Sequence, residues 1–494
     1  MDEVARPRWL VRSLTFICFA LAVAGNCRAD ISLATIFSDH MVLQQDSSVK
    51  IWGMTDPGTE IVVKFIDQTA SGTANARGQW SVSIQTPKAG GPYKLEVSAK
   101  AGEPKIVLTD VMVGEVWICS GQSNMEWPVE AASNPEKEID AAKEFANVRL
   151  FTIEHHAMTQ AQSEFGKCEQ WSVCSPETVR KFSAAAYFFG RKLNKELNIP
   201  IGLVDSSWGG TACESWTSID AMQDVPEFEP LLKHWRETED PTNPNRPSNL
   251  FNGMISPLKG FVVRGVVWYQ GEANVERGRQ YAQLFPRMIG CWRKTLAEGR
   301  PMPFLFVQIA PFRYQSAPPE ALPEIWDAQL KTFRTVENVG IVVTTDIGNI
   351  RDIHPGNKQD VGDRLANWAM EKCYRDLRPA DAAPFHHCGP IYRSCRVEGS
   401  LIRIEFDSAI GLKTRDDQPP THFIICGSDE KFVSAVARID GETVIVEAPQ
   451  VLEPVAVRFA WTDTAEPNLI NAAGLPASPF RTDDFKLLSN DKDY

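Results

Sequence analysis

The sequence predicts an α/β protein in which a helix-covered parallel sheet is flanked by an N-terminal and a C-terminal β-sandwich-like domain. Short alternating segments occur near both ends of the chain, and long apolar runs alternate with helical stretches in the middle. With 494 residues the chain is too long for one ordinary core. We therefore expect an N-terminal domain over 30–110, a central domain over 111–378 and a C-terminal domain over 379–494.

The first 29 residues differ from the rest. Arginines precede the apolar run "SLTFICFALAVAG", and small residues follow at Cys27 and Ala29. A basic segment, a short apolar run and a small-residue cleavage site are the parts of a signal peptide. The sequence therefore predicts cleavage near Ala29 and export to the periplasm or the extracellular space. The run is too short to span a bilayer comfortably, and no later run resembles it, so no membrane association is expected.

Alternation defines the N-terminal domain. The segments "SSVKIWGM", "TEIVVKFID", "GQWSVSIQ" and "YKLEVSAK" alternate apolar and polar residues, with turn residues such as "DPG" and "AGGPY" between them. A period of two with regular turns predicts an antiparallel β-sandwich.

The middle of the chain has strands of another kind. The nearly continuous apolar runs are "VMVGEVWICS", "IPIGLVDSS", "FVVRGVVWYQG", "PFLFVQIAP" and "VGIVVTTDIG". Helical periodicity separates them over 176–198, 277–296, 322–336 and 357–374. Apolar strands alternating with helices predict a parallel sheet covered on both faces. Reactive groups in such sheets collect beyond the carboxyl ends of the strands.

Alternation returns after about residue 379, in "LIRIEFDS", "THFIICGS", "FVSAVARIDGETVIVEAP" and "PVAVRFAWTD". This pattern predicts a second β-domain. The segment "NLINAAGLPASPFRTDDF" is rich in Pro, Gly and Asn, and we expect it to close the domain as an ordered loop.

Polar clusters follow the central strands and contain the parts of a serine esterase. A serine hydroxyl needs a base within hydrogen-bond reach and donors aimed at the developing oxyanion. Ser123 in "GQSN" and His354 in "RDIHPGN" are candidates for nucleophile and base, although a helix-capping serine and a surface histidine fit each position as well. Paired glycines in "WGGT" permit close backbone approach. Gln270 and Asn274 offer amide donors, and either also fits a buried loop.

Four of these clusters resemble the motif blocks of the sialate O-acetylesterase family, which belongs to the SGNH hydrolases. They are "GEVWICSGQSNMEWP", "WGGTACESW", "WYQGEANV" and "DIHPGNKQDVGDRLANWA", and "IFSDHMVLQ" and "GLPASPFRTDDF" extend the resemblance to nearly all of the chain after residue 29. The resemblance implies a flavodoxin-like three-layer domain. It also implies a secreted esterase that removes O-acetyl groups, from O-acetylated sialic acid first of all, through a serine acetyl-enzyme.

The resemblance assigns Ser123 as the nucleophile and His354 as the general base. Many SGNH hydrolases place an aspartate three residues before the histidine, where this chain has Arg351. Asp352 is therefore the first candidate for the catalytic acid. Glu272, or a backbone carbonyl serving a Ser–His dyad, remains an alternative.

The oxyanion hole implied by the resemblance uses the N–H groups of Ser123 and Gly210. Gln270 is preferred to Asn274 as the side-chain donor. The same motif blocks supply the candidate substrate-binding residues, which are Gln122, Trp208, Glu214, Trp216 and Glu272.

We expect no metal or organic cofactor. Two adjacent histidine pairs, His155–His156 and His386–His387, lack the spacing of zinc ligands. A net charge of −12 argues against nucleic acid and anionic membranes as partners. The expected partner is an O-acetylated carbohydrate, and the sequence leaves the oligomeric state open.

Two other functions fit parts of the sequence. One is an acetyl esterase acting on xylan or another acetylated polysaccharide. The other is a non-catalytic glycan-binding protein that uses its β-domains. Hydrolysis of a simple acetate ester separates the binding protein from both esterases. Arginines near strand ends are candidates for a sialic acid carboxylate, and surface solvation explains each equally well; they are Arg264, Arg313 and Arg351.

Overall fold

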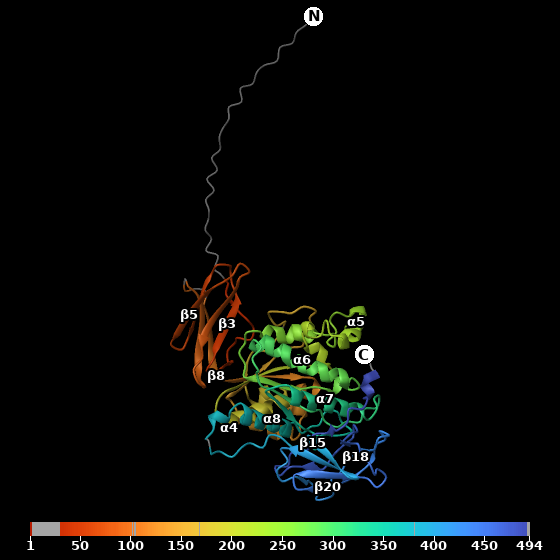
Figure 1. Cartoon of the computed structure of the whole chain (residues 1–494). Coiled ribbons are helices and arrows are strands. Elements are labelled where there is room, and N and C mark those ends of the chain that lie inside the picture. Colours follow the sequence, from red (N-terminus) through yellow and green to blue (C-terminus); the bar gives the residue numbers. More distant parts are fainter. Residues whose placement is uncertain (2–29, 101, 103–104, 167, 380, 492–494) are drawn as a thin grey trace.

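The computed structural model describes residue 1 and residues 30–491, apart from 101, 103, 104, 167 and 380. The signal peptide predicted for residues 1–29 lies outside the described residues, apart from residue 1 itself. The fold is α/β, and additional β-sheet domains precede and follow the central sheet along the chain (Figure 1). Over the described part of the chain, no helix is both long enough and apolar enough to cross a membrane.

The N-terminal strands pair in two sheets. The first sheet has the order β1-β3-β6, and in the second β4 pairs with β5 and β7, while β7 pairs with β8. Every second residue of β6 is buried, as the alternation in the sequence predicts. The bounds are β1 (Ser32–Leu33), β2 (Val42–Gln44), β3 (Ser48–Met54), β4 (Glu60–Phe65), β5 (Gln68–Thr73), β6 (Gln79–Gln85) and β7 (Gly90–Ala99).

One long strand joins this region to the central sheet. Strand β8 (Lys105–Gly121) pairs antiparallel with β7 in its first half and parallel with β11 (Ile201–Ser207) and β12 (Gly265–Tyr269) in its second half. Its burial changes from alternating to continuous at Val111, where both faces of the strand become covered. The boundary predicted between residues 110 and 111 therefore falls inside a continuous strand.

The central sheet has the order β10-β9-β11-β8-β12-β13-β14, with β10 as its antiparallel edge strand. The five apolar runs predicted as strands correspond to β8, β11, β12, β13 and β14. The sequence analysis missed β9 and β10. The remaining bounds are β9 (Val148–Thr152), β10 (Ser172–Val173), β13 (Phe304–Val307) and β14 (Val339–Val342).

Four long helices accompany this sheet, and α4 packs on α8 while α6 packs on α7 (Figure 1). The single helix predicted over 176–198 is wrong, because the chain forms α3 (Pro176–Val179) and then α4. The break lies at Ser183, whose hydroxyl donates to Met125 O and accepts the Ala186 N–H at 3.2 Å. The bounds are α4 (Ala184–Leu197), α6 (Gly278–Ala297), α7 (Ala321–Thr335) and α8 (Lys358–Lys372).

Three parallel strands end in the same row of the sheet. Gly121 of β8 is in register with Ser207 of β11 and with Tyr269 of β12. The Gln122 N–H donates to Tyr269 O at 3.0 Å. Gly121 has a φ of 145°, and a Cβ there would lie 2.1 Å from Tyr269 O, so only glycine fits. The polar segments that follow these strands therefore start side by side.

The C-terminal region forms two four-stranded antiparallel sheets and a short pair. The predicted closing loop contains β23 and β24, and its Ser478 donates to Gln308 Oε1, one residue after β13, at 3.1 Å. The bounds are β15 (Ile391–Glu398), β16 (Leu401–Asp407), β17 (Lys413–Thr414), β18 (Phe423–Cys426), β19 (Val433–Ser434), β20 (Val436–Asp440), β21 (Thr443–Glu447), β22 (Ala456–Phe459), β23 (Leu469–Ile470) and β24 (Phe480–Arg481).

Candidate active site

Ser123 and His354 lie within hydrogen-bond distance of each other. Ser123 begins α1 (Ser123–Glu126) two residues after β8, and its Oγ is 2.8 Å from Nε2 of His354. The residue that caps α1 is Gln122, so the serine hydroxyl is not used as a helix cap. His354 reaches the serine from the loop between β14 and α8. The distance suits transfer of the hydroxyl proton to the imidazole.

The environment of His354 favours its neutral form. Its ring stacks on Trp127, with centroids 4.5 Å apart and planes 15° apart. Partial burial is the main cause that lowers the pKa of His354, and the positive charge of Lys358 lowers it further, while Asp352 opposes both. A neutral imidazole is the form that accepts a proton.

Asp352 lies beside His354 but is hydrogen-bonded to its main chain. The Asp352 Oδ1 accepts the His354 backbone N–H at 2.9 Å. Among the residues that the structure describes, no hydrogen bond joins a carboxylate to the imidazole ring, whose one bond is to Ser123. Asp352 therefore orders the loop and acts on the ring through its charge.

A buried amide connects three of the predicted motifs. Asn124 follows the candidate nucleophile, and its Nδ2 donates to Glu272 Oε1 at 2.6 Å and to Ile353 O at 2.9 Å. Its Oδ1 accepts a hydrogen bond of 2.5 Å from Nζ of Lys358. Asn124 thereby ties the serine turn to the "QGEAN" segment and to the histidine loop. The sequence analysis did not select Asn124 or Lys358.

The two ionisable side chains of this network, Lys358 and Glu272, are buried. Lys358 is 1% exposed and its Nζ lies 5.3 Å from the centre of the Tyr269 ring. Burial lowers the pKa of Lys358 to about 7 and raises the pKa of Glu272. The Oε2 atom of Glu272 is buried and has no hydrogen-bond partner in the described chain. Asn124 separates the two charged groups and satisfies one atom of each.

The loop after β11 presents backbone N–H groups beside Ser123. The Gly209 N–H donates to Glu126 Oε2 at 2.6 Å, and a Cβ at Gly209 would lie 3.3 Å from the Cβ of Ser123. Within the described structure, the N–H groups of Gly210 and Ser123 have no intramolecular acceptor. Gly210 is exposed, with a φ of 73°. Of the two glycines, Gly210 therefore keeps a donor for a ligand.

The two candidate amide donors differ in how their hydrogens are used. Gln270 Nε2 donates to Asn274 Oδ1 at 2.7 Å and to Thr211 O at 3.2 Å, which occupies both of its hydrogens. Asn274 Nδ2 has one hydrogen bond within the described chain, to Glu214 Oε2 at 2.9 Å. Asn274 therefore has a hydrogen left to donate to a ligand, and Gln270 has none.

Three of the predicted substrate-binding residues are buried and form hydrogen bonds or ion pairs with neighbouring segments of the site. Gln122 Oε1 accepts the N–H groups of Gly271 and Ala273 at 3.3 Å and 3.1 Å, and so holds the "QGEAN" turn. Glu214 is buried and pairs with Arg277 at 2.7 Å. Trp216 is fully buried, and its indole N–H is bonded within the core. None of these side chains faces solvent.

Trp208 is the accessible member of the predicted set. Its half-buried ring stacks on His155, with centroids 4.1 Å apart and planes 4° apart. His155 Nε2 lies 2.8 Å from Glu126 Oε1, and Glu126 in turn accepts the Gly209 N–H. The stacked pair therefore lies next to the loop that carries Gly210, where an amphipathic ring can contact a bound sugar.

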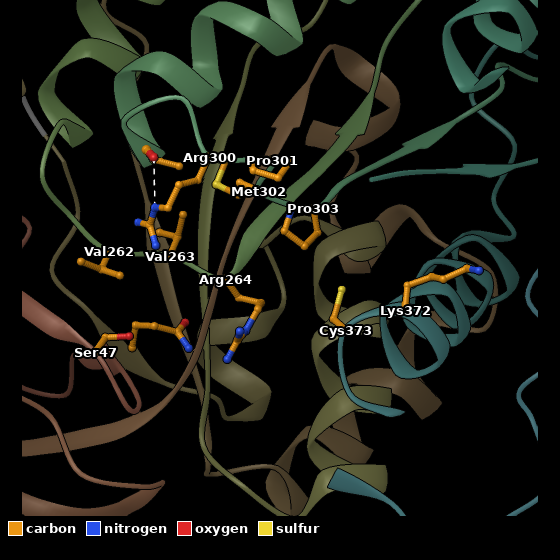
Figure 2. A pocket seen from close by; sticks show the side chains of 12 residues that line it. Ser47, Val262, Val263, Arg264, Arg300, Pro301, Met302, Pro303, Lys372 and Cys373 are labelled. Atoms are coloured by element: carbon orange, nitrogen blue, oxygen red, sulfur yellow. Dashed lines mark hydrogen bonds between the residues drawn. The ribbon is translucent and has the colours of Figure 1, made fainter. Parts of the chain in front are cut away.

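Two cavities differ in their relation to this site. A cavity of about 330 Å³ adjoins Gly210 and Ala273. A second one, of about 370 Å³, lies before β12 and β13, at the amino ends of the parallel strands and so away from Ser123. Figure 2 shows Arg264 and Arg300 in its wall, with Lys372 extending away from the other labelled side chains. Arg264 binds the buried Glu115 at 2.5 Å and 2.8 Å, so it does not serve the serine site.

Among the described side chains, no group of three or more His, Cys, Asp or Glu is arranged to hold a metal ion.

Comparisons with known proteins show which family this chain resembles over most of its length. The sequence model of a family described as "Carbohydrate esterase, sialic acid-specific acetylesterase" matches residues 113–371. The sialate O-acetylesterase of Mus musculus is 30% identical, with 87% of this chain and 89% of the relative covered. That of Homo sapiens is 29% identical, with 90% and 91% covered. The crystal structure of a carbohydrate acetylesterase from Xanthomonas citri is 35% identical with a TM-score of 0.83, covering 92% of this chain and 100% of that one.

Proposed function

This chain belongs to the carbohydrate esterase family of sialic acid-specific acetylesterases, and from that premise we propose that it is an exported serine esterase whose first substrate is O-acetylated sialic acid. The observation that carries the proposal is the 2.8 Å distance from Ser123 Oγ to His354 Nε2, beside the unpartnered N–H groups of Ser123 and Gly210. Export rests on the signal-like sequence of residues 1–29.

The reaction starts with attack on the acetyl carbonyl. Ser123 Oγ bonds to the carbonyl carbon while His354 Nε2 takes the hydroxyl proton. The oxyanion that forms accepts hydrogen bonds from the Ser123 and Gly210 N–H groups and from Asn274 Nδ2. Asn274 replaces Gln270 in this role because both hydrogens of Gln270 are bonded elsewhere. Asp352 stabilises the imidazolium by its charge, which is the direction in which it moves the pKa of His354.

In the next step His354 acts as an acid. The bond between the acetyl carbon and the sugar oxygen breaks, and His354 gives its proton to that oxygen, so the sugar leaves as an alcohol. Water then attacks the acetyl-enzyme, with His354 accepting its proton. As the bond between the acetyl carbon and Ser123 Oγ breaks, His354 gives this proton to Oγ, acetic acid is released as acetate, and the free serine and neutral imidazole are restored. Each oxyanion donor of this kind is typically worth about 3–4 kcal/mol of transition-state stabilisation.

The proposal includes a finer description of the fold. We assign a flavodoxin-like three-layer catalytic domain to 111–378, between β-sandwich-like domains over 30–110 and 379–494. The parallel sheet order and the two helix pairs α4–α8 and α6–α7 support the three layers.

A polysaccharide acetyl esterase is the second candidate. It is consistent with the Xanthomonas citri structure, which is 35% identical to this chain and is described as a carbohydrate acetylesterase with no sugar named. The catalytic steps are the same for both substrates.

The test measures acetate release from 9-O-acetylated sialic acid, acetylated xylan and p-nitrophenyl acetate. Ser123→Ala is compared with wild type and with Ser71→Ala, an exposed serine of β5 that serves as the control. We expect Ser123→Ala to lose all release and to keep the wild-type urea denaturation curve, and Ser71→Ala to resemble wild type in both. Turnover by folded Ser123→Ala would refute the mechanism. Serine-dependent release from xylan but not from sialic acid would support the mechanism and identify an acetylated polysaccharide, rather than sialic acid, as the substrate.

A further inference from the structure

Glu126 joins the helix that begins at Ser123 to the loop that follows β11. It is the last residue of α1, and its Oε2 accepts the Gly209 N–H at 2.6 Å. A Cβ at Gly209 would lie 2.9 Å from this oxygen and 3.3 Å from the Cβ of Ser123, so the loop packs directly on the helix. The next N–H along the loop is that of Gly210, the proposed oxyanion donor. Glu126 therefore fixes the peptide that immediately precedes this donor.

The bond from Gly209 to Glu126 decides which glycine N–H is available to a ligand. Two successive glycines give the loop more backbone freedom than other residues would, and Gly210 has a φ of 73°. On its far side the loop is held by Asn245, whose Nδ2 donates to Gly210 O at 3.2 Å. Of the two glycine N–H groups, that of Gly209 is occupied, so that of Gly210 is the one that can face an oxyanion.

The other carboxylate oxygen of Glu126 has a partner of its own. Its Oε1 lies 2.8 Å from Nε2 of His155, and the His155 ring stacks on Trp208, the residue before Gly209. Two acceptors would repel each other at this distance, so His155 Nε2 carries a hydrogen. With one oxygen on Gly209 and the other beside His155, the carboxylate cannot turn without losing a partner.

The segment that carries His155 is itself closely packed. The Ile153 N–H donates to Asp205 O of β11 at 2.9 Å, two residues before His155. A Cβ at Gly253 would lie 1.8 Å from His156 O, so that glycine allows the segment to approach another part of the chain. Glu126 is therefore supported by well-packed backbone. An oxyanion hole requires such preorganisation, because its donors must already be in place when the charge develops.

The contacts of Glu126 separate it from the catalytic acid. Its two oxygens face Gly209 and His155, and no hydrogen bond in the described structure joins it to His354. By charge alone, a carboxylate close to a developing oxyanion would raise the energy of the transition state. A favourable contribution of Glu126 therefore comes from the loop that it holds and not from its charge.

We infer that Glu126 is a positioning residue for the oxyanion hole, whose carboxylate, held by His155, keeps the Gly210 N–H directed at the acetyl oxygen. The inference rests on the proposed function and adds a residue to it. Because the same oxyanion forms from every acetyl ester, Glu126 acts on kcat, and it does so equally for glycan esters and for small esters.

The test compares Glu126→Met with Glu126→Gln. Methionine keeps an unbranched side chain and removes the carboxylate acceptor, whereas glutamine keeps an oxygen that can accept the Gly209 N–H and an amide that can donate to a neutral His155. Glu130→Met is the matched control, because Glu130 is exposed and its carboxylate has no hydrogen bond or ion pair in the described structure. For each variant, kcat and KM are measured with 9-O-acetylated sialic acid, acetylated xylan and p-nitrophenyl acetate, and folding is measured by urea denaturation.

We expect Glu126→Met to lower kcat about 10- to 100-fold on every ester that the wild type hydrolyses, with KM little changed, because a donor misplaced by about 1 Å can cost about 100-fold in rate. Glu126→Gln should recover most of this loss, which a side chain acting through its charge would not allow. Glu130→Met should resemble wild type.

A kcat for folded Glu126→Met within about twofold of wild type would overturn the positioning role, as would equal losses in Glu126→Met and Glu126→Gln or a loss confined to KM. If Glu126→Met does not fold, His155→Phe replaces it, because phenylalanine keeps a ring against Trp208 and removes the nitrogen beside Glu126. It should lower kcat and leave KM unchanged, and an unchanged kcat would refute the assignment. Turnover by folded Ser123→Ala would instead contradict the proposed function, so the two failures are distinguishable.

Discussion

Replacing the buried Lys358 by methionine should change how stability depends on pH. Lys358 is the first residue of α8, and its Nζ donates to Asn124, which follows the proposed nucleophile Ser123. Burial lowers the pKa of this lysine from 10.5 to about 7. Methionine is unbranched, apolar and adaptable, so it fills the space without carrying the charge.

The size and the sign follow from that pKa. Between pH 7 and 10.5 the unfolded chain binds a proton at this lysine that the folded chain does not bind, so stability rises with pH across this window. One pKa unit corresponds to 1.36 kcal/mol, which gives a rise of about 5 kcal/mol over the window. In Lys358→Met this rise is absent. The stability of wild type minus that of the variant therefore increases with pH across this window.

Urea denaturation followed by tryptophan fluorescence, from pH 6.5 to 10, measures this difference directly. Lys372→Met is the control, because Lys372 is an exposed lysine in the last turn of the same helix. We expect the control to follow wild type at every pH. The variant has a second readout, since loss of the Lys358 charge raises the pKa of His354 and moves the acid limb of kcat/KM to higher pH. Parallel stability curves for wild type and Lys358→Met would refute the reasoning.

Two further substitutions test other parts of the structure. Asn274→Ala removes the side-chain donor proposed for the oxyanion and should lower kcat about 10²- to 10³-fold on p-nitrophenyl acetate, with KM little changed. A kcat within a few-fold of wild type would show that Asn274 is not the oxyanion donor. Arg264→Met leaves the carboxylate of the fully buried Glu115 without its cation and should lower the free energy of unfolding by about 3–5 kcal/mol in urea denaturation. The kinetics of the folded variant should match those of wild type. A variant as stable as wild type would contradict the Arg264–Glu115 pairing at the amino ends of the strands.

Within the central sheet, the strands that could be predicted from the sequence are those whose burial is continuous. Strands β8, β11 and β12 are covered on both faces, and they contain the apolar runs that a parallel sheet requires. Strand β9 was missed because Arg149 interrupts its apolar run. That guanidinium is buried against Asp110, which lies at the bend of β8 and far away in sequence. A charged residue inside a strand is recognisable only when its partner is known.

The break between α3 and α4 is hidden for a similar reason. Ser183 fits a helix as well as it fits a cap, and helical periodicity continues on both sides of it. Ser183 begins α4 as its N-cap, and its hydroxyl donates to Met125 O in α1, the helix that starts at Ser123. The cause lies in the tertiary structure and leaves no local signal.

Motifs at strand ends indicate which segments meet, whereas the role of each residue depends on partners that come from other segments. The aligned ends of β8, β11 and β12 explain why "GQSN", "WGGT" and "QGEAN" converge. Gln270 and Asn274 carry the same amide group, and they differ in their acceptors: Gln270 donates to Thr211 O and Asn274 Oδ1, whereas Asn274 donates to Glu214. Lys358, in the first turn of a helix, has the sequence context of a surface lysine. In the structure it is buried, and its Nζ donates to Asn124. An amide or a lysine in this site therefore acquires its function from hydrogen bonds that join segments distant in sequence, so such roles must be assigned from the donors and acceptors that remain unbonded.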